Sequence, residues 1–151
     1  MDVQDEIKSL KERIAELEEQ VKEEQKFPKD GDAYWYINHL GIVLRDEWFG
    51  FVSERYMIEI GNFFKTEQDA HFAVEKLKVE AELRKFSRPF KCGEINQYIF
   101  LDTDSECLDV VGLSYSQYQG TIYFESEEKA QQAIEAVGID RIKKYIFGVE
   151  D

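Results

Sequence analysis

TEQDAHFAVEKL at residues 66–77 returns in outline 60 residues later, as SEEKAQQAIEAV at residues 126–137. Each segment begins with a hydroxyl residue favoured as a helix N-cap, and carboxylates follow in the first turn, where the helix dipole favours them. Each predicts an amphipathic helix, the first ending near Phe86 and the second at Gly138. Five positions correspond at this offset: Thr66 and Ser126, Ala70 and Ala130, Ala73 and Ala133, Val74 and Ile134, and Leu77 and Val137.

Short runs of β-branched and aromatic residues precede each predicted helix, which is typical of strands. They lie at residues 33–37, 42–44 and 55–60 before the first helix, and at 98–101, 108–111 and 121–124 before the second. A β-meander followed by a helix therefore occurs twice. The pattern predicts an α+β fold with an antiparallel sheet and an internal duplication. Two unrelated capped helices that agree by chance are the alternative.

The predicted domain organisation follows from these patterns. We expect an oligomerisation helix over residues 1–27 and one α+β domain over 28–151. That domain would contain half-repeats at about 33–86 and 95–147, with a last short helix over 140–147.

The first 27 residues carry an apolar stripe with the heptad spacing of a coiled coil. β-branched residues at position a, with leucine at most d positions, favour a parallel two-stranded coil. In that register Glu6 faces Lys11 of the other strand, and Arg13 faces Glu18, both attractively. The stripe consists of Val3, Ile7, Leu10, Ile14, Leu17 and Val21. The alternative is one amphipathic helix that folds back on its own domain.

The composition is acidic, with a net charge of −13 from 32 acidic and 19 basic residues. This charge would repel a nucleic-acid duplex or an anionic membrane, so direct nucleic-acid binding and membrane binding are not expected. A soluble surface and a surface that recognises a basic partner are the two interpretations. No segment approaches a membrane span, and MDVQDEIK is unlike a secretory signal, so we expect a cytoplasmic protein.

Catalytic and metal motifs are missing from the sequence, and we expect neither an enzyme nor a cofactor. Cys92 and Cys107 lack metal-ligand spacing and are expected to be reduced thiols. His71 is predicted among core-facing positions, and His39 in an exposed turn. The acidic run 102–106 resembles the start of a calcium loop, but the glycine and glutamate that such a loop needs are absent.

Basic and aromatic residues give candidate binding positions. Cations near the end of the first predicted helix would either offset the helix dipole or form a local anion site; they are Arg84, Lys85, Arg88 and Lys91. A second cluster, Arg141, Lys143 and Lys144, lies near the C-terminus. Exposed-looking aromatic residues would either stack on a base or anchor a protein, or else fill the core. Trp35, Trp48, Tyr115 and Tyr118 are the candidates among them.

Several strings of the sequence resemble a family of small phage and prophage proteins of Firmicutes. The strings are YWYI at 34–37, GNFFKT at 61–66, EKLKV at 75–79, IYFESEE at 122–128 and RIKKY at 141–145. This resemblance implies a phage origin and an accessory role in the host cytoplasm, without established catalytic residues.

Together these observations favour a non-enzymatic phage accessory protein that forms a parallel dimer and binds a host protein with a basic surface. Inhibition of host defence, such as a CRISPR effector nuclease, is the leading hypothesis, with carboxylates standing where phosphates would lie. The alternatives are a protein that sequesters a nucleotide signal and a phage structural or assembly protein.

Overall fold

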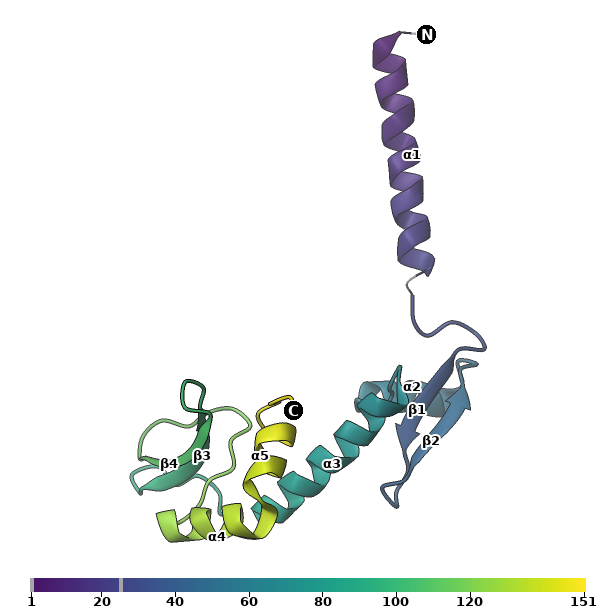
Figure 1. Cartoon of the computed structure of the whole chain (residues 1–151). Coiled ribbons are helices and arrows are strands. Elements are labelled where there is room, and N and C mark those ends of the chain that lie inside the picture. Colours follow the sequence, from purple (N-terminus) through teal and green to yellow (C-terminus); the bar gives the residue numbers. More distant parts are fainter. Residues whose placement is uncertain (1, 25) are drawn as a thin grey trace. The chain divides into compact units, whose positions relative to one another are not determined.

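The computed structural model describes every residue except 1 and 25. The fold is α+β, as predicted: a long N-terminal helix precedes two separate antiparallel two-stranded sheets, each followed by helices (Figure 1). The elements are α1 (Val3–Glu24), β1 (Ala33–Ile37), β2 (Val43–Glu47), α2 (Val52–Glu59), α3 (Glu67–Arg84), β3 (Asn96–Asp102), β4 (Cys107–Leu113), α4 (Glu127–Val137) and α5 (Ile139–Tyr145).

These elements form two compact units. Unit 1 holds the described residues up to Tyr36 together with Leu44–Glu67, and unit 2 holds Ile37–Val43 and Gln68–Asp151. No described helix combines the length and the apolar character that a membrane span requires.

The duplication is visible in the way each sheet is extended. Trp35 in the middle of β1 exchanges two backbone hydrogen bonds with Phe64, at 2.9 and 2.8 Å. Gln97 in β3 makes the same antiparallel bridge with Phe124, at 3.0 and 2.8 Å. Each bridging phenylalanine lies two residues before the position predicted as a helix N-cap. In the second repeat the strand predicted at 121–124 is therefore reduced to the bridge at Phe124, and residues 121–123 are not strand. In the first repeat the bridge at Phe64 lies outside the strand predicted at 55–60.

The turns that begin the two repeats also correspond. The N–H of Gly31 donates to the carbonyl of Trp48 at 2.8 Å, and the N–H of Gly93 donates to the carbonyl of Ser114 at 2.9 Å. Both glycines have φ of 85°, in the left-handed region that glycine adopts without strain. Each turn therefore closes the open end of its hairpin in the same way.

The strand predicted at residues 55–60 is wrong, because these residues belong to α2. The Glu54 carboxylate, which is only 3% exposed, accepts the N–H of Phe51 at 2.9 Å and that of Phe49 at 3.2 Å. A glutamate that reaches back to the N-cap backbone is a helix-start device. Gly61 has φ of 75° directly after the helix. These local signals prevail over the β propensity of the apolar residues between them.

Helix α3 buries two different faces, whereas the sequence predicts a single buried face. Ala70 and Val74 are buried as expected, but Leu77 is 56% exposed and Ala81 is also exposed. The buried positions move to Val79 and Leu83, each nine residues, or about two and a half helical turns, beyond the first pair. His71 is exposed rather than core-facing. The second half of α3 therefore buries the side of the helix that lies opposite the side buried by its first half.

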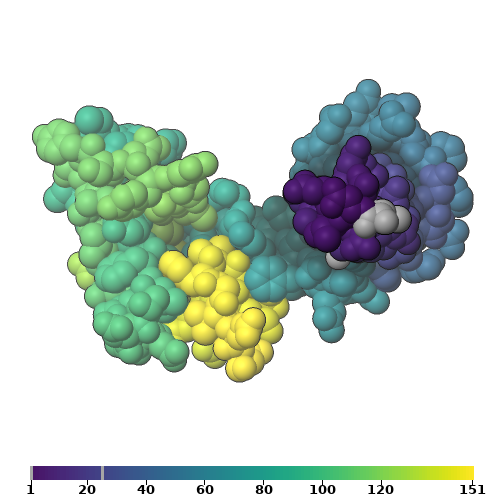
Figure 2. All heavy atoms as spheres, turned by 90° about the horizontal axis from the view of Figure 1, so that it is seen from above, coloured from purple at the N-terminus to yellow at the C-terminus, as the bar shows by residue number. Residues whose placement is uncertain are grey.

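The core of unit 2 forms where α3, α4 and α5 meet the β3–β4 hairpin. Ser126 caps α4 as predicted, its hydroxyl accepting the N–H of Lys129 at 3.1 Å. Gly138, with φ of 101°, ends α4 and starts α5. Figure 2 shows the C-terminal residues, in yellow, packed against atoms of this unit. The buried cluster is Val79, Leu83, Phe124, Ala130, Ala133, Ile134, Val137 and Ile142.

The two-faced burial of α3 gives a direct test. Val79→Ala should lower the free energy of unfolding by about 2 kcal/mol, because it removes two buried carbons and leaves a cavity. Leu77→Ala, although it lies on the predicted stripe, should change it by less than about 0.5 kcal/mol. Urea unfolding followed by circular dichroism measures both. Equal losses in the two variants would contradict the observed burial.

Candidate binding surfaces

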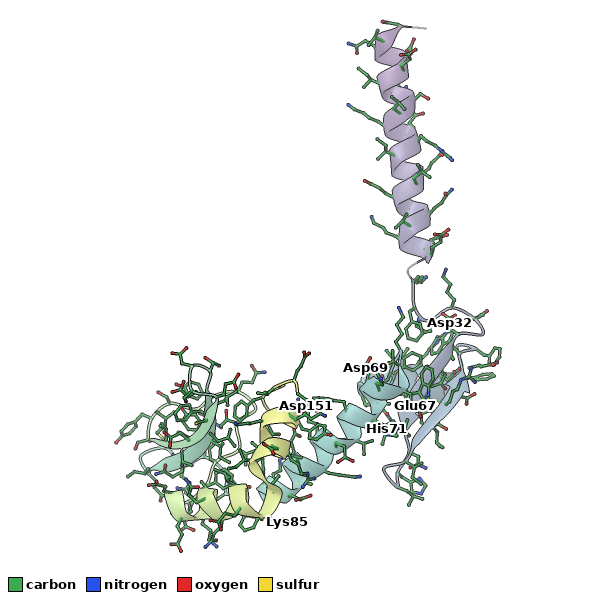
Figure 3. The ribbon with its side chains drawn as sticks, in the orientation of Figure 1. Asp32, Glu67, Asp69, His71, Lys85 and Asp151 are labelled. Carbon is green, nitrogen blue, oxygen red and sulfur yellow. The ribbon has the colours of Figure 1, made fainter. Side chains whose placement is uncertain are left out.

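The heptad stripe of α1 is the largest run of exposed apolar side chains on one element. No residue of α1 is buried, and the six stripe residues are between 43% and 66% exposed. Figure 3 shows side chains projecting from all sides of this helix. Large apolar side chains in water at regular heptad positions are the surface that a second helix covers in a coiled coil. All six predicted residues, from Val3 to Val21, are therefore on one continuous helix and accessible.

The predicted cation cluster at residues 84–91 is largely engaged in internal contacts. Arg84 lies 3.6 Å from Glu80, and the Lys91 ammonium lies 3.9 Å from Glu94. Lys85 lies at the C-terminal end of α3 (Figure 3). The Arg88 side chain is only 15% exposed, and its Nε is buried without a hydrogen-bond partner among the described residues. These cations therefore do not converge on one open anion site.

Arg88 is held by Asn96, the fully buried amide at the start of β3. The Asn96 Oδ1 accepts from the Arg88 guanidinium at 2.8 Å and from the N–H of Lys91 at 2.9 Å. Its Nδ2 donates to the carbonyls of Lys91, Glu94 and Leu113, at 2.9, 2.9 and 3.0 Å. Five hydrogen bonds satisfy a group that would be costly to bury unpaired. Asn96 therefore fixes the loop that leads into unit 2's sheet.

The corresponding centre of unit 1 is aromatic. Phe63 stacks on the buried ring of Tyr34, with centroids 4.3 Å apart, and meets Trp48 edge-on at 5.5 Å and Phe27 at 5.6 Å. Trp35 and Trp48 are half-buried beside β1 and β2. Burial raises the pKa of the Tyr34 phenol, and the nearby Glu54 carboxylate raises it further. Trp48 is therefore mainly a packing residue rather than a free anchor.

Tyr115 and Tyr118 lie in the segment after β4 and remain accessible. Tyr115 is 80% exposed, whereas Tyr118 is half exposed and meets Tyr98 edge-on at 5.7 Å. The backbone N–H of Tyr118 donates to the hydroxyl of Tyr123 at 2.6 Å. The segment is thus tied to the sheet while the Tyr115 ring projects into solvent. These two residues are the most accessible of the predicted aromatic candidates.

Unit 1 contains a groove that the sequence does not predict as a site. It has a volume of about 590 Å³, and the structure places three lysines and two aromatic rings around it. The Nζ of Lys65 lies 5.6 Å from the ring centre of Phe27, a cation–π distance. The lining residues are Glu24, Lys26, Phe27, Lys29, Asp32, Ala33, Trp35 and Lys65. Lysines far apart in the sequence meet here, so no local sequence motif signals the groove.

The second predicted cation cluster includes one structural ion pair. The Arg141 guanidinium donates to both carboxylate oxygens of Glu82, each at 3.1 Å, and so connects α5 to α3. Hydrogen bonding to Arg141 holds the pKa of Glu82 below its ordinary value. The same carboxylate raises the pKa of Arg141. Lys144 contacts Asp151 at 3.1 Å.

The remaining candidates give no metal centre. Across the described part of the chain, no three His, Cys, Asp or Glu side chains gather as possible metal ligands. In the acidic run 102–106, the Asp102 carboxylate accepts the N–H groups of Asp104 and Ser105 at 2.9 and 3.3 Å and so shapes the β3–β4 turn. Cys92 and Cys107 are free and exposed.

Comparison with protein-family models, with curated proteins and with solved structures finds no match for this chain.

The lowered pKa of Glu82 predicts a pH dependence of stability. A carboxyl whose folded pKa is depressed stabilises the fold above its unfolded pKa, and this contribution is lost as the pH falls through the folded pKa. The melting temperature of Glu82→Gln should therefore fall less steeply below about pH 4.5 than that of the native chain. Thermal melts between pH 7 and pH 3 measure the slopes. The control is Glu135→Gln, an exposed acid on α4; if Glu82→Gln keeps the native slope, the pair does not act as described.

Proposed function

We propose that this chain is a non-catalytic, self-associating phage accessory protein that acts by binding a basic host protein. The observation that carries the proposal is the exposed heptad stripe of α1. Six apolar side chains at a and d positions, each at least 43% exposed, are costly to leave in water and are covered when a second copy of α1 pairs with the first. The charges beside the stripe support a parallel pair, since Glu6 would face Lys11 and Arg13 would face Glu18.

The net charge of −13 supports a basic partner. In unit 2, the β3–β4 turn and the strand residues beside it carry four exposed carboxylates, and none has an ion-pair partner among the described residues: Asp102, Asp104, Glu106 and Asp109. Carboxylates spaced along a projecting turn can occupy a channel that normally holds phosphates. With the phage resemblance, the first partner class to test is a host nucleic-acid enzyme, such as a defence nuclease.

Self-association is tested by placing charge in the stripe. Leu10→Asp together with Leu17→Asp should convert a dimer into a monomer, because burying these carboxylates in the seam costs several kcal/mol, more than about three heptads can offset. Light scattering at matched concentration measures the mass, and circular dichroism monitors the α+β region. The control, Ser9→Asp with Ala15→Asp, adds the same charge outside the stripe and should remain dimeric. A dimeric stripe variant would place the interface elsewhere.

Partner binding is tested by capture from a host lysate that contains active defence systems, followed by a nuclease assay. Asp104→Lys with Glu106→Lys should reduce recovery of the captured basic protein about tenfold or more, because like charges then face each other. Native capture should weaken as salt screens the contact. The control is Glu12→Lys with Glu19→Lys, which makes the same charge change on α1. Capture that is insensitive to salt and to the hairpin variant would contradict phosphate mimicry.

A further inference from the structure

The lysine groove of unit 1 has the chemistry of an anion site in an otherwise acidic protein. Lys26, Lys29 and Lys65 surround it, and none of their ammonium groups has a carboxylate within 4.0 Å among the described residues. The lining also includes the carboxylates of Glu24 and Asp32. The Asp32 Oδ2, however, accepts the N–H of Lys29 at 2.8 Å, so this carboxylate is engaged in shaping the turn. Three cations thus line the groove without an ion-pair partner among the described residues.

Two rings complete the groove. Phe27 and Trp35 both line it, and the phenylalanine ring already carries the Lys65 ammonium at 5.6 Å. An aromatic wall beside ammonium groups suits a ligand that has a planar ring next to its negative charge, because the ring stacks while the ammonium groups contact the anion. The volume of about 590 Å³ is that of a small-molecule site.

The second repeat provides an internal comparison. The turn Lys29-Asp30-Gly31 corresponds to Lys91-Cys92-Gly93, at an offset of 62 residues. There the cations are used internally: Lys91 approaches Glu94 at 3.9 Å, and the residue corresponding to Lys26 is Arg88, which is bonded to Asn96 and to the Ile95 carbonyl.

The position corresponding to Lys65, at the helix offset of 60, is Glu125. The two repeats therefore share a backbone plan, but only the first leaves three cations facing a groove.

We propose that the lysine groove binds a nucleotide, with the phosphates at Lys26, Lys29 and Lys65 and the base against Trp35 and Phe27. Glu24 and Asp32 limit the negative charge that the groove accepts, and they offer acceptors for amino or hydroxyl groups of the base and sugar. The nucleotide is either free in solution or part of a single strand, because both sources present the same phosphate and base.

Trp35 provides the measurement. The chain has two tryptophans, so Trp48→Phe leaves Trp35 as the only indole. In this background, ATP and a short single-stranded oligonucleotide are titrated separately, with pyrophosphate as the ring-free probe. At least one of the two nucleotide probes should quench Trp35 saturably, and the one that binds more tightly identifies the source. Pyrophosphate should bind more weakly and cause little quenching.

Charge variants of the full chain locate the site. Lys26→Gln with Lys65→Gln should raise the dissociation constant about tenfold or more, since charge-assisted contacts to phosphate are lost. Lys85→Gln with Lys91→Gln makes the same charge change in unit 2 and should leave the dissociation constant within about twofold. The proposal is overturned if neither nucleotide probe gives saturable quenching by roughly millimolar concentration, or if both double variants weaken binding equally. It is also overturned if pyrophosphate binds as tightly as the nucleotides. None of these results bears on partner binding by the hairpin tip.

Discussion

The two-bond bridge between a strand and a phenylalanine three residues before a helix recurs in both repeats. Trp35 with Phe64 in unit 1, and Gln97 with Phe124 in unit 2, bring the chain back to the first strand of the hairpin shortly before the next helix begins. The bridge is made by backbone groups, so it does not require a particular side-chain donor or acceptor. It fixes where the helix starts relative to the sheet in unit 2, and the buried Phe124 side chain then joins the core that α4 and α5 complete. The side chains around the bridge differ between the two repeats.

That divergence is clearest at the paired positions Tyr34 and Asn96. Both are almost completely buried next to the bridging residue of their strand. Tyr34 stacks on Phe63 and belongs to an aromatic cluster, whereas Asn96 replaces the ring with five hydrogen bonds to the loop around it. A packed ring needs no polar partner, and the lysines that line the groove of unit 1 make no ion pair among the described residues. A buried amide needs partners, and in unit 2 it takes up Arg88 and the backbone of Lys91.

Much of this fold could be predicted from the sequence, because capped amphipathic helices carry local signals. Ser126 and Gly138 bound α4 as expected. The sequence predicts a strand at residues 55–60, but they belong to α2 and the turn after it, because the contact of Glu54 with the Phe51 N–H outweighs their β-rich composition. The exposed Leu77 shows a second limit: periodicity assumes one buried face, and α3 has two. Of the candidate binding residues, the α1 stripe lies exposed along one helix, whereas the role of Arg88 depends on a buried amide eight residues away. The lysine groove forms because Lys65 lies close in space to Lys26 and Lys29, and no spacing rule in the sequence predicts that proximity.

The exposed stripe of α1 has a consequence for valency. If α1 pairs in parallel as proposed, the two copies of the helix end side by side, and each assembly would carry two hairpin tips and two grooves. When one copy has bound a partner that has repeated sites, the second copy binds from an effective concentration that short linkers raise to the millimolar range. Residence time would then exceed what either copy achieves alone, without any new contact. A weak individual surface can in this way give a long-lived complex, and the length of the chain between α1 and β1 becomes a determinant of avidity.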